Sequence, residues 1–94
     1  MDNEYLIIVD TPEPGVLTVE LSANGAPIDL IRTPYQGPVD NLLLTTIDNL
    51  LMKHRIHKFA LKAVQLGQGI DKNSSLYRMV QSFATAIAAA HQRP

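Results

Sequence analysis

The dipeptide Asn24-Gly25 constrains the fold of this chain more than any other feature of the sequence. Asparagine and glycine accept the positive φ angles that a two-residue turn between antiparallel strands requires. Apolar and β-branched residues predominate on both sides of the dipeptide, in residues 16–22 and 27–33, and again in residues 5–10. Residues 11–15, which contain two prolines and a glycine, are typical of a turn. The sequence therefore predicts a three-stranded antiparallel meander.

The apolar pattern changes period after residues 34–38, a second segment with two prolines and a glycine. Pro38 and Asp40 suit the start of a helix, because proline fits its first turn and an acidic side chain there complements the helix dipole. The residues that then recur at helical spacing are Val39, Leu43, Ile47, Leu50 and Leu51. The cationic residues that suit the end of this helix are Lys53, His54 and Arg55. We expect a helix here, followed by a fourth strand at residues 59–66.

The strongest helical signal comes last in the sequence. The six apolar residues spaced as one helix face are Leu76, Met79, Val80, Phe83, Ala84 and Ile87. Asn73 and Ser74 are both suited to the N-cap position of this helix. In the resulting order β-β-β-α-β-α, the first helix connects the third and fourth strands, and a right-handed crossover would place the fourth strand parallel to a neighbour. The sequence predicts a single α/β domain over residues 1–94.

Length and composition agree with one small folded domain. The 94 residues are 46% hydrophobic and 18% charged, with a formal net charge of −1. The basic residues are not clustered as in nucleic-acid-binding proteins, so we expect no direct nucleic-acid binding. There is no cysteine, which fits a reducing compartment, and no apolar run approaches the ~20 residues that span a bilayer. We expect a soluble, cytoplasmic domain that does not bind membranes.

The segment Gly67-Gln68-Gly69 precedes the last helix and raises the question of phosphate binding. A Walker loop ends in Gly-Lys-Ser/Thr, and the dinucleotide fingerprint has a third glycine that opens the helix. Neither is present, because Lys72 lacks the adjoining glycine and no glycine follows Gly69. We interpret the segment as a connection between strand and helix, and we expect no cofactor.

Asp10 ends the first predicted strand, a common place for a metal-binding carboxylate in two-metal nucleases. Such a site needs further acids, yet the end of the fourth strand has none, and Asp71 in the following loop is the one acid near it in the sequence. We therefore favour a turn-forming role for Asp10. The histidines suit helix ends rather than a metal site, because no third ligand clusters with them: His54, His57 and His91.

The two helices carry more apolar and small residues than one thin sheet can cover, and exposed surface of that kind usually marks a protein–protein contact. Arg78, in the first turn of the last helix, is unfavourable to the helix dipole and would gain from an acidic partner. The residues expected in a partner interface are Leu42, Leu44, Met52, Arg78, Ser82, Thr85, Ala86 and Ala89. The alternative is that the alanines serve only to favour the helix.

Three segments resemble the TsaB family, the scaffold subunit of bacterial tRNA threonylcarbamoyladenosine synthesis. They are Val9-Asp10-Thr11, the stretch from Leu43 to Leu51 with its Ile47-Asp48, and Ser74-Ser75-Leu76-Tyr77-Arg78. Arg78 falls where the arginine of that family falls. The sequence departs from the family in its thinned glycine run and in lacking the His-Ser pair that commonly opens the first helix. It also covers about half of the family's usual length, so the second lobe is missing.

The resemblance implies a ribonuclease-H/actin-like half-domain that has no complete nucleotide cleft and no catalysis of its own. It also implies a partner, either an ATPase-fold subunit of the TsaD kind, with which TsaB pairs through these two helices, or a second copy of the chain. We therefore expect a non-enzymatic interaction module that forms a homodimer or heterodimer. Two alternatives stay open: a truncated metal-dependent nuclease of the Holliday-resolvase type that uses Asp10, and a structural domain with no partner.

Overall fold

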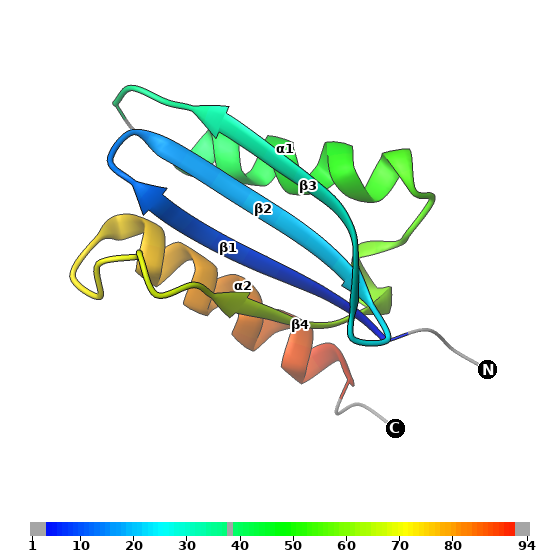
Figure 1. Cartoon of the computed structure of the whole chain (residues 1–94). Helices are drawn as coiled ribbons and strands as arrows, with labels where there is room; N and C mark the ends of the chain where they lie inside the picture. Colours follow the sequence, from blue (N-terminus) through cyan, green and yellow to red (C-terminus); the bar gives the residue numbers. More distant parts are fainter. Residues whose placement is uncertain (1–3, 38, 92–94) are drawn as a thin grey trace.

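A computed structural model describes residues 4–37 and 39–91 of the chain. The strands are β1 (Tyr5–Glu13), β2 (Val16–Ala23), β3 (Ala26–Pro34) and β4 (Leu61–Leu66). The helices are α1 (Asp40–Lys53) and α2 (Ser75–His91), and a short 3₁₀ helix, Lys58–Ala60, precedes β4. The predicted order β-β-β-α-β-α is confirmed, and Figure 1 shows how the strands and helices follow one another.

The four strands form one sheet in the order β3-β2-β1-β4. β1 pairs antiparallel with β2 and parallel with β4, so that Val9 lies opposite Val19 on one side and Leu66 on the other. β2 pairs antiparallel with β3. The predicted meander and the parallel fourth strand are therefore both confirmed.

The turns of the meander explain where its strands end. Asn24 and Gly25 have φ angles of 55° and 86°, as a two-residue hairpin turn between right-twisted strands requires. The prediction that residues 11–15 form a turn was wrong for its first part. β1 continues to Glu13, with a register irregularity after Asp10, and only Pro14 and Gly15 turn. Pro12 lies within this irregular stretch. Proline has no backbone N–H to donate, and an irregular part of a strand tolerates the loss of one hydrogen bond between strands.

The start of the fourth strand also differs from the prediction. β4 begins at Leu61 rather than at residue 59, because residues 58–60 form the 3₁₀ turn. The backbone N–H of Ala60 donates to the carbonyl oxygen of His57 at 2.8 Å, and this bond closes the turn. A single 3₁₀ turn of this kind is a frequent connector between longer elements.

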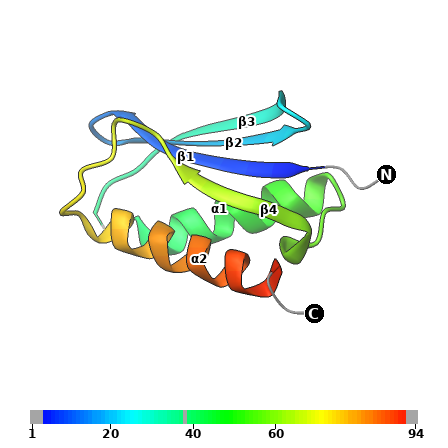
Figure 2. The same cartoon turned by 90° about the horizontal axis from the view of Figure 1, so that it is seen from below.

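Both helices cover the same face of the sheet, as Figure 2 shows from below. Alternate residues of β1 and β2 point into this layer, including Ile7, Val9, Leu17, Val19 and Leu21, each with no exposed surface. They pack against the buried stripes of the helices, which include Leu43, Ile47 and Leu50 in α1 and Leu76, Val80 and Ile87 in α2. The apolar spacing that predicted the two helices therefore corresponds to their core-facing sides. On β3, at the edge of the sheet, Ile28 and Leu30 are exposed.

The end of α1 is fastened to the edge strand β3. The carboxylate of Asp29 accepts hydrogen bonds from Nε2 of His54 at 2.8 Å and from Nζ of Lys53 at 2.9 Å. These bonds, that of His54 foremost, and a third from the backbone N–H of Leu30 hold the pKa of Asp29 well below its ordinary value. His54 is also the C-cap residue of α1, so its predicted place at a helix end is confirmed.

Candidate protein-interaction surface

Asp10 joins the end of β1 to the loop between β4 and α2. Its Oδ1 accepts hydrogen bonds from the backbone N–H of Thr11 at 2.8 Å and of Gly69 at 3.0 Å. The hydroxyl of Thr11 donates to the carbonyl oxygen of Gly69 at 3.0 Å. Asp10 was predicted to form a turn, but β1 continues through Thr11 to Glu13, so its bond to the N–H of Thr11 lies within the strand. Its bond to Gly69 joins residues 59 positions apart. Asp10 therefore holds strand β1 and the loop after β4 together.

The two glycines of this loop are required by the closeness of these contacts. A Cβ on Gly67 would lie well under 3.0 Å from the carboxylate carbon of Asp10, and one on Gly69 would lie equally close to the carbonyl oxygen of Thr11. Gly67 and Gly69 do not have positive φ angles. The glycines thus serve the close approach of two chain segments.

The start of α2 lies beside this loop, and its N-cap is Ser74. The hydroxyl oxygen of Ser74 accepts a hydrogen bond from the backbone N–H of Tyr77 at 3.1 Å and donates one to the carbonyl oxygen of Asp71 at 2.7 Å. Of the two N-cap candidates, Ser74 is therefore the one that caps. A pocket of about 250 Å³ adjoins this cap, and its lining includes Tyr35, Thr11 and Asp71. Among the described residues, its lining has a carboxylate and no lysine or arginine, which makes the pocket poorly suited to phosphate.

The arrangement around Asp10 does not favour the nuclease hypothesis. The carboxylate of Asp71 accepts a bond from the backbone N–H of Asn73 at 2.9 Å within its own loop. Within residues 4–37 and 39–91, no three His, Asp or Glu side chains gather as a metal site would need. His54 is bound to Asp29, and His91 is the last residue of α2. The carboxylates of Asp10 and Asp71 thus both accept hydrogen bonds from nearby backbone N–H groups.

Most of the predicted interface residues lie exposed on the two helices. Met52 is 75% exposed and Leu44 is 42% exposed. Arg78 and four small residues of α2 are exposed as well. We call these seven residues the outer helix surface: Leu44, Met52, Arg78, Ser82, Thr85, Ala86 and Ala89.

Leu42 is placed differently from the other seven predicted residues. It is half-buried and packs against the core cluster. It also lies about 200° around the helix axis from Leu44, because each residue advances the helix by about 100°. Leu42 and Leu44 therefore do not share one face of α1, and Leu42 has less surface to offer a partner.

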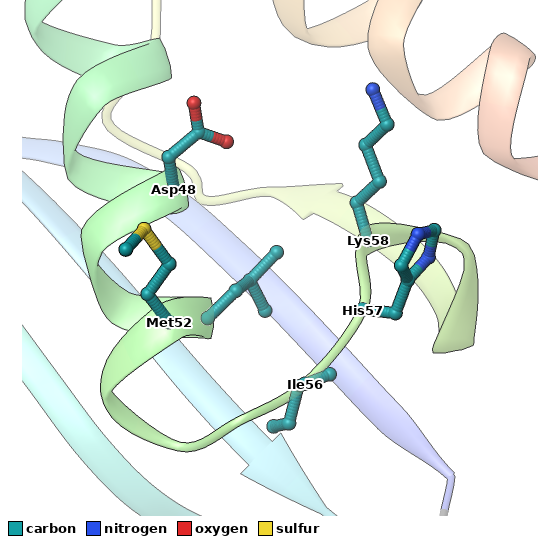
Figure 3. Close-up of a pocket in the computed structure, with 6 residues that line it drawn as sticks. Asp48, Met52, Ile56, His57 and Lys58 are labelled. Atoms are coloured by element: carbon teal, nitrogen blue, oxygen red, sulfur yellow. The ribbon is translucent and has the colours of Figure 1, made fainter.

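A second pocket, of about 280 Å³, lies at the end of α1 next to the outer helix surface. Figure 3 shows Asp48 and Met52 on the α1 side of this pocket and His57 and Lys58 on the opposite side. Leu51 and Ile56 supply apolar lining. Asp48, Ile56 and Lys58 were not among the predicted site residues, although the i, i+4 spacing of Asp48 and Met52 would have grouped these two on one helix face.

The helices of the described residues include none long and apolar enough to cross a membrane. No protein-family model matches the sequence, and no curated protein matches it.

The solved structures that are similar to this chain include two that are described as follows. One is YeaZ from Pseudomonas aeruginosa, and the other is described as an uncharacterized protein with similarity to peptidase YEAZ from Pseudomonas aeruginosa. Each superposes with a TM-score of 0.70 over 97% of this chain at 22% sequence identity. The chain spans 41% of the length of each. YeaZ is another name for TsaB, so the half-length resemblance to TsaB and the ribonuclease-H-like fold class are confirmed.

Proposed function

We propose that this chain is a non-catalytic, cytoplasmic protein-interaction module that dimerises through its two helices, as a scaffold or partner subunit related to tRNA threonylcarbamoyladenosine modification. The observation that carries the proposal is the outer helix surface, where two exposed large apolar side chains of α1 accompany four small residues of α2. The link to tRNA modification is supported by the TsaB-like fold. The partner is a second copy of the chain or an ATPase-fold subunit of the TsaD kind.

The chemistry of the surface suits contact with another pair of helices. Ser82, Thr85 and Ala89 are spaced so that they lie along one side of α2, and short side chains let a second backbone approach closely. Met52 adds a flexible, polarizable side chain that adapts to an irregular neighbour. Burying such apolar area favours association, and the loss of translational and rotational freedom opposes it.

The experiment is light scattering of the purified chain at micromolar concentration, compared with the variant Ala86→Arg. We expect the wild type to be dimeric and the variant to be monomeric, because a guanidinium group on a small-residue face both separates the helices and places a charge in the contact. A wild type that stays strictly monomeric, and is unchanged by Ala86→Arg, contradicts the proposal.

The matched control is Gln65→Arg. Gln65 is exposed on β4 and pairs with Ile8, whose neighbours Ile7 and Val9 point to the helices, so Gln65 lies on the opposite face of the sheet. The control adds the same side chain far from the outer helix surface and should leave the dimer intact. If both arginine variants dissociate the dimer equally, its contact does not involve the helices.

A further inference from the structure

Strand β3 is an edge strand, and within the described part of the chain only β2 pairs with it (Figure 1). Its register on β2 is regular over residues 29–34, and just beyond them the backbone N–H of Tyr35 donates to the carbonyl oxygen of Gly15 at 2.9 Å. Hydrogen-bonded and non-bonded pairs alternate along an antiparallel ladder, so every second residue counted back from Tyr35 bonds to β2. Arg32 and Leu30 lie between these residues. Their backbone N–H and C=O groups are therefore directed toward the free edge.

The free edge of β3 is complementary to the same edge of a second copy. If two copies of β3 run antiparallel with Ile31 opposite Ile31, the N–H and C=O groups of Leu30 in one copy meet those of Arg32 in the other. Each Leu30–Arg32 pair can exchange both of its N–H···O bonds, and the two-fold axis repeats the pair. Pro27 and Pro34 lie on either side of this stretch, and proline has no N–H to donate to a partner strand. An edge with free N–H and C=O groups is where a sheet is prone to pair with another chain.

The carboxylate of Asp29 occupies one of the N–H donors of this edge. Its Oδ1 accepts a hydrogen bond from the backbone N–H of Leu30 at 2.8 Å. The bonds from Lys53 and His54 go to the other oxygen, Oδ2, so the bond to Leu30 is separate from the link to α1. An inward-pointing charged side chain on an edge strand is one of the features by which natural sheets avoid edge-to-edge pairing.

We propose that Asp29 prevents the free edge of β3 from pairing with the β3 strand of a second copy. Because its carboxylate takes the N–H of Leu30, each Leu30–Arg32 pair would lose one of its hydrogen bonds. In the same register Asp29 would lie opposite Thr33 of the second copy, which would bring a charge into the contact. The inference does not depend on the helix dimer of the proposed function, since it concerns the edge of the sheet and not the outer helix surface.

The test is the self-association of Asp29→Val, measured by analytical ultracentrifugation in an Ala86→Arg background that lacks the proposed helix dimer. Valine removes the acceptor and suits a strand. We expect Asp29→Val to lower the Kd of self-association at least about tenfold relative to the background chain, since each copy regains a backbone hydrogen bond. Adding Leu30→Pro deletes the N–H itself and should reverse the association.

The matched control for the loss of the link to α1 is the double variant Lys53→Ala/His54→Ala in the same background. It releases the end of α1 but keeps the carboxylate beside Leu30, so it should sediment like the background chain. If it associates as strongly as Asp29→Val, the cause is the released helix and the proposal is wrong. The proposal is also wrong if Asp29→Val sediments like the background chain, or if Leu30→Pro does not reverse its association.

Amide hydrogen exchange of the wild type tests the same contact without relying on the folding of a variant. After correction for intrinsic rates, the N–H of Leu30 should exchange at least about tenfold more slowly than that of Arg32, because it donates to the carboxylate of Asp29. Equal rates would show that Asp29 does not occupy this donor and would overturn the proposal. In the associated Asp29→Val chain the N–H of Arg32 should become protected as well, and an unchanged rate would place the contact away from β3.

Discussion

At the scale of single residues, Gly69 shows that a glycine pair resembling a phosphate-binding motif can be required by packing. Its N–H donates to Asp10, its carbonyl oxygen accepts from Thr11, and the space for a Cβ is occupied by the backbone of Thr11. A clash with backbone is harder to relieve than one with a flexible side chain, such as that between Gly67 and Asp10. The close contact between β1 and the loop after β4 thus explains the glycine pair that suggested phosphate binding.

We predict that Gly69→Ala destabilises the protein by roughly 2–3 kcal/mol, because the added Cβ forces the end of β1 and the loop apart. Urea unfolding monitored by circular dichroism measures the change. The matched control is Gln68→Ala, between the two glycines, which is exposed and should change stability by less than about 0.5 kcal/mol. Equal stability of Gly69→Ala and wild type would show that this joint does not contribute to folding.

At the scale of elements, Asp29 links the last turn of α1 to the edge strand β3. The helix reaches β3 at its last turn, where Lys53 and His54 both donate to this carboxylate. An anion at this position also faces the C-terminal end of the helix, so the two cationic residues are needed to make the contact favourable. The side chains of α1 that the sequence marked as suited to a helix end therefore have a second role as an anchor.

We predict that Asp29→Asn lowers the melting temperature near neutral pH and that the difference from wild type shrinks in acid. The folded-state pKa of Asp29 is depressed, so its contribution is present above the unfolded-state pKa of about 3.9 and is lost as pH falls toward the folded value. Thermal unfolding from pH 8 to pH 2 measures this. A difference for Asp29→Asn that stays constant with pH would exclude the ionic contact as its cause.

At the scale of the whole molecule, the helix layer has one side on the sheet and one side exposed. The sheet side buries the apolar stripes of α1 and α2, and the exposed side carries the outer helix surface. A domain of this size hides only about two-thirds of its unfolded surface, so we expect a modest stability to which the proposed partner would add. Association and stability are therefore coupled in the proposed dimer.

We predict that the melting temperature of the wild type rises with protein concentration, because only the folded state can dimerise. Differential scanning calorimetry between about 5 and 500 μM should show a rise of several degrees. The Ala86→Arg variant, which cannot dimerise under this proposal, should melt at the same temperature throughout. A wild-type melting temperature that does not depend on concentration contradicts a dimer that contributes to stability.

The sequence was sufficient for the order of elements, since turn chemistry and apolar period are local. Asn24-Gly25 fixed one hairpin, and the six-residue stripe of α2 marked its buried side. It was insufficient where distant segments meet. β1 extends through Pro12 because it pairs with β2, whereas a proline in the local sequence indicates a turn. The bond between Asp10 and Gly69 joins residues 59 positions apart.

The candidate surface shows the same limit. Exposure of Met52 and Leu44 follows from which side of α1 meets the sheet, and helical spacing already separates Leu42 from Leu44 by about 200°. The pocket beside Asp48 was not predictable, because Ile56 and Lys58 lie beyond the helix in a loop whose path the sequence pattern does not fix.

The parallel pairing of β1 with β4 bears on the order in which the molecule assembles. The two turns of the meander join strands that are neighbours in sequence, whereas Tyr5 and Leu61 must close a loop of more than about fifty residues before they can pair. Non-local closure of this kind is slow, so the meander is expected to form first and the β4–α2 segment to dock last. Five of the seven residues of the outer helix surface lie on α2, so most of that surface forms only in the final step of folding. A nascent or partly folded chain would thus be unable to pair with a second copy until its own sheet is complete.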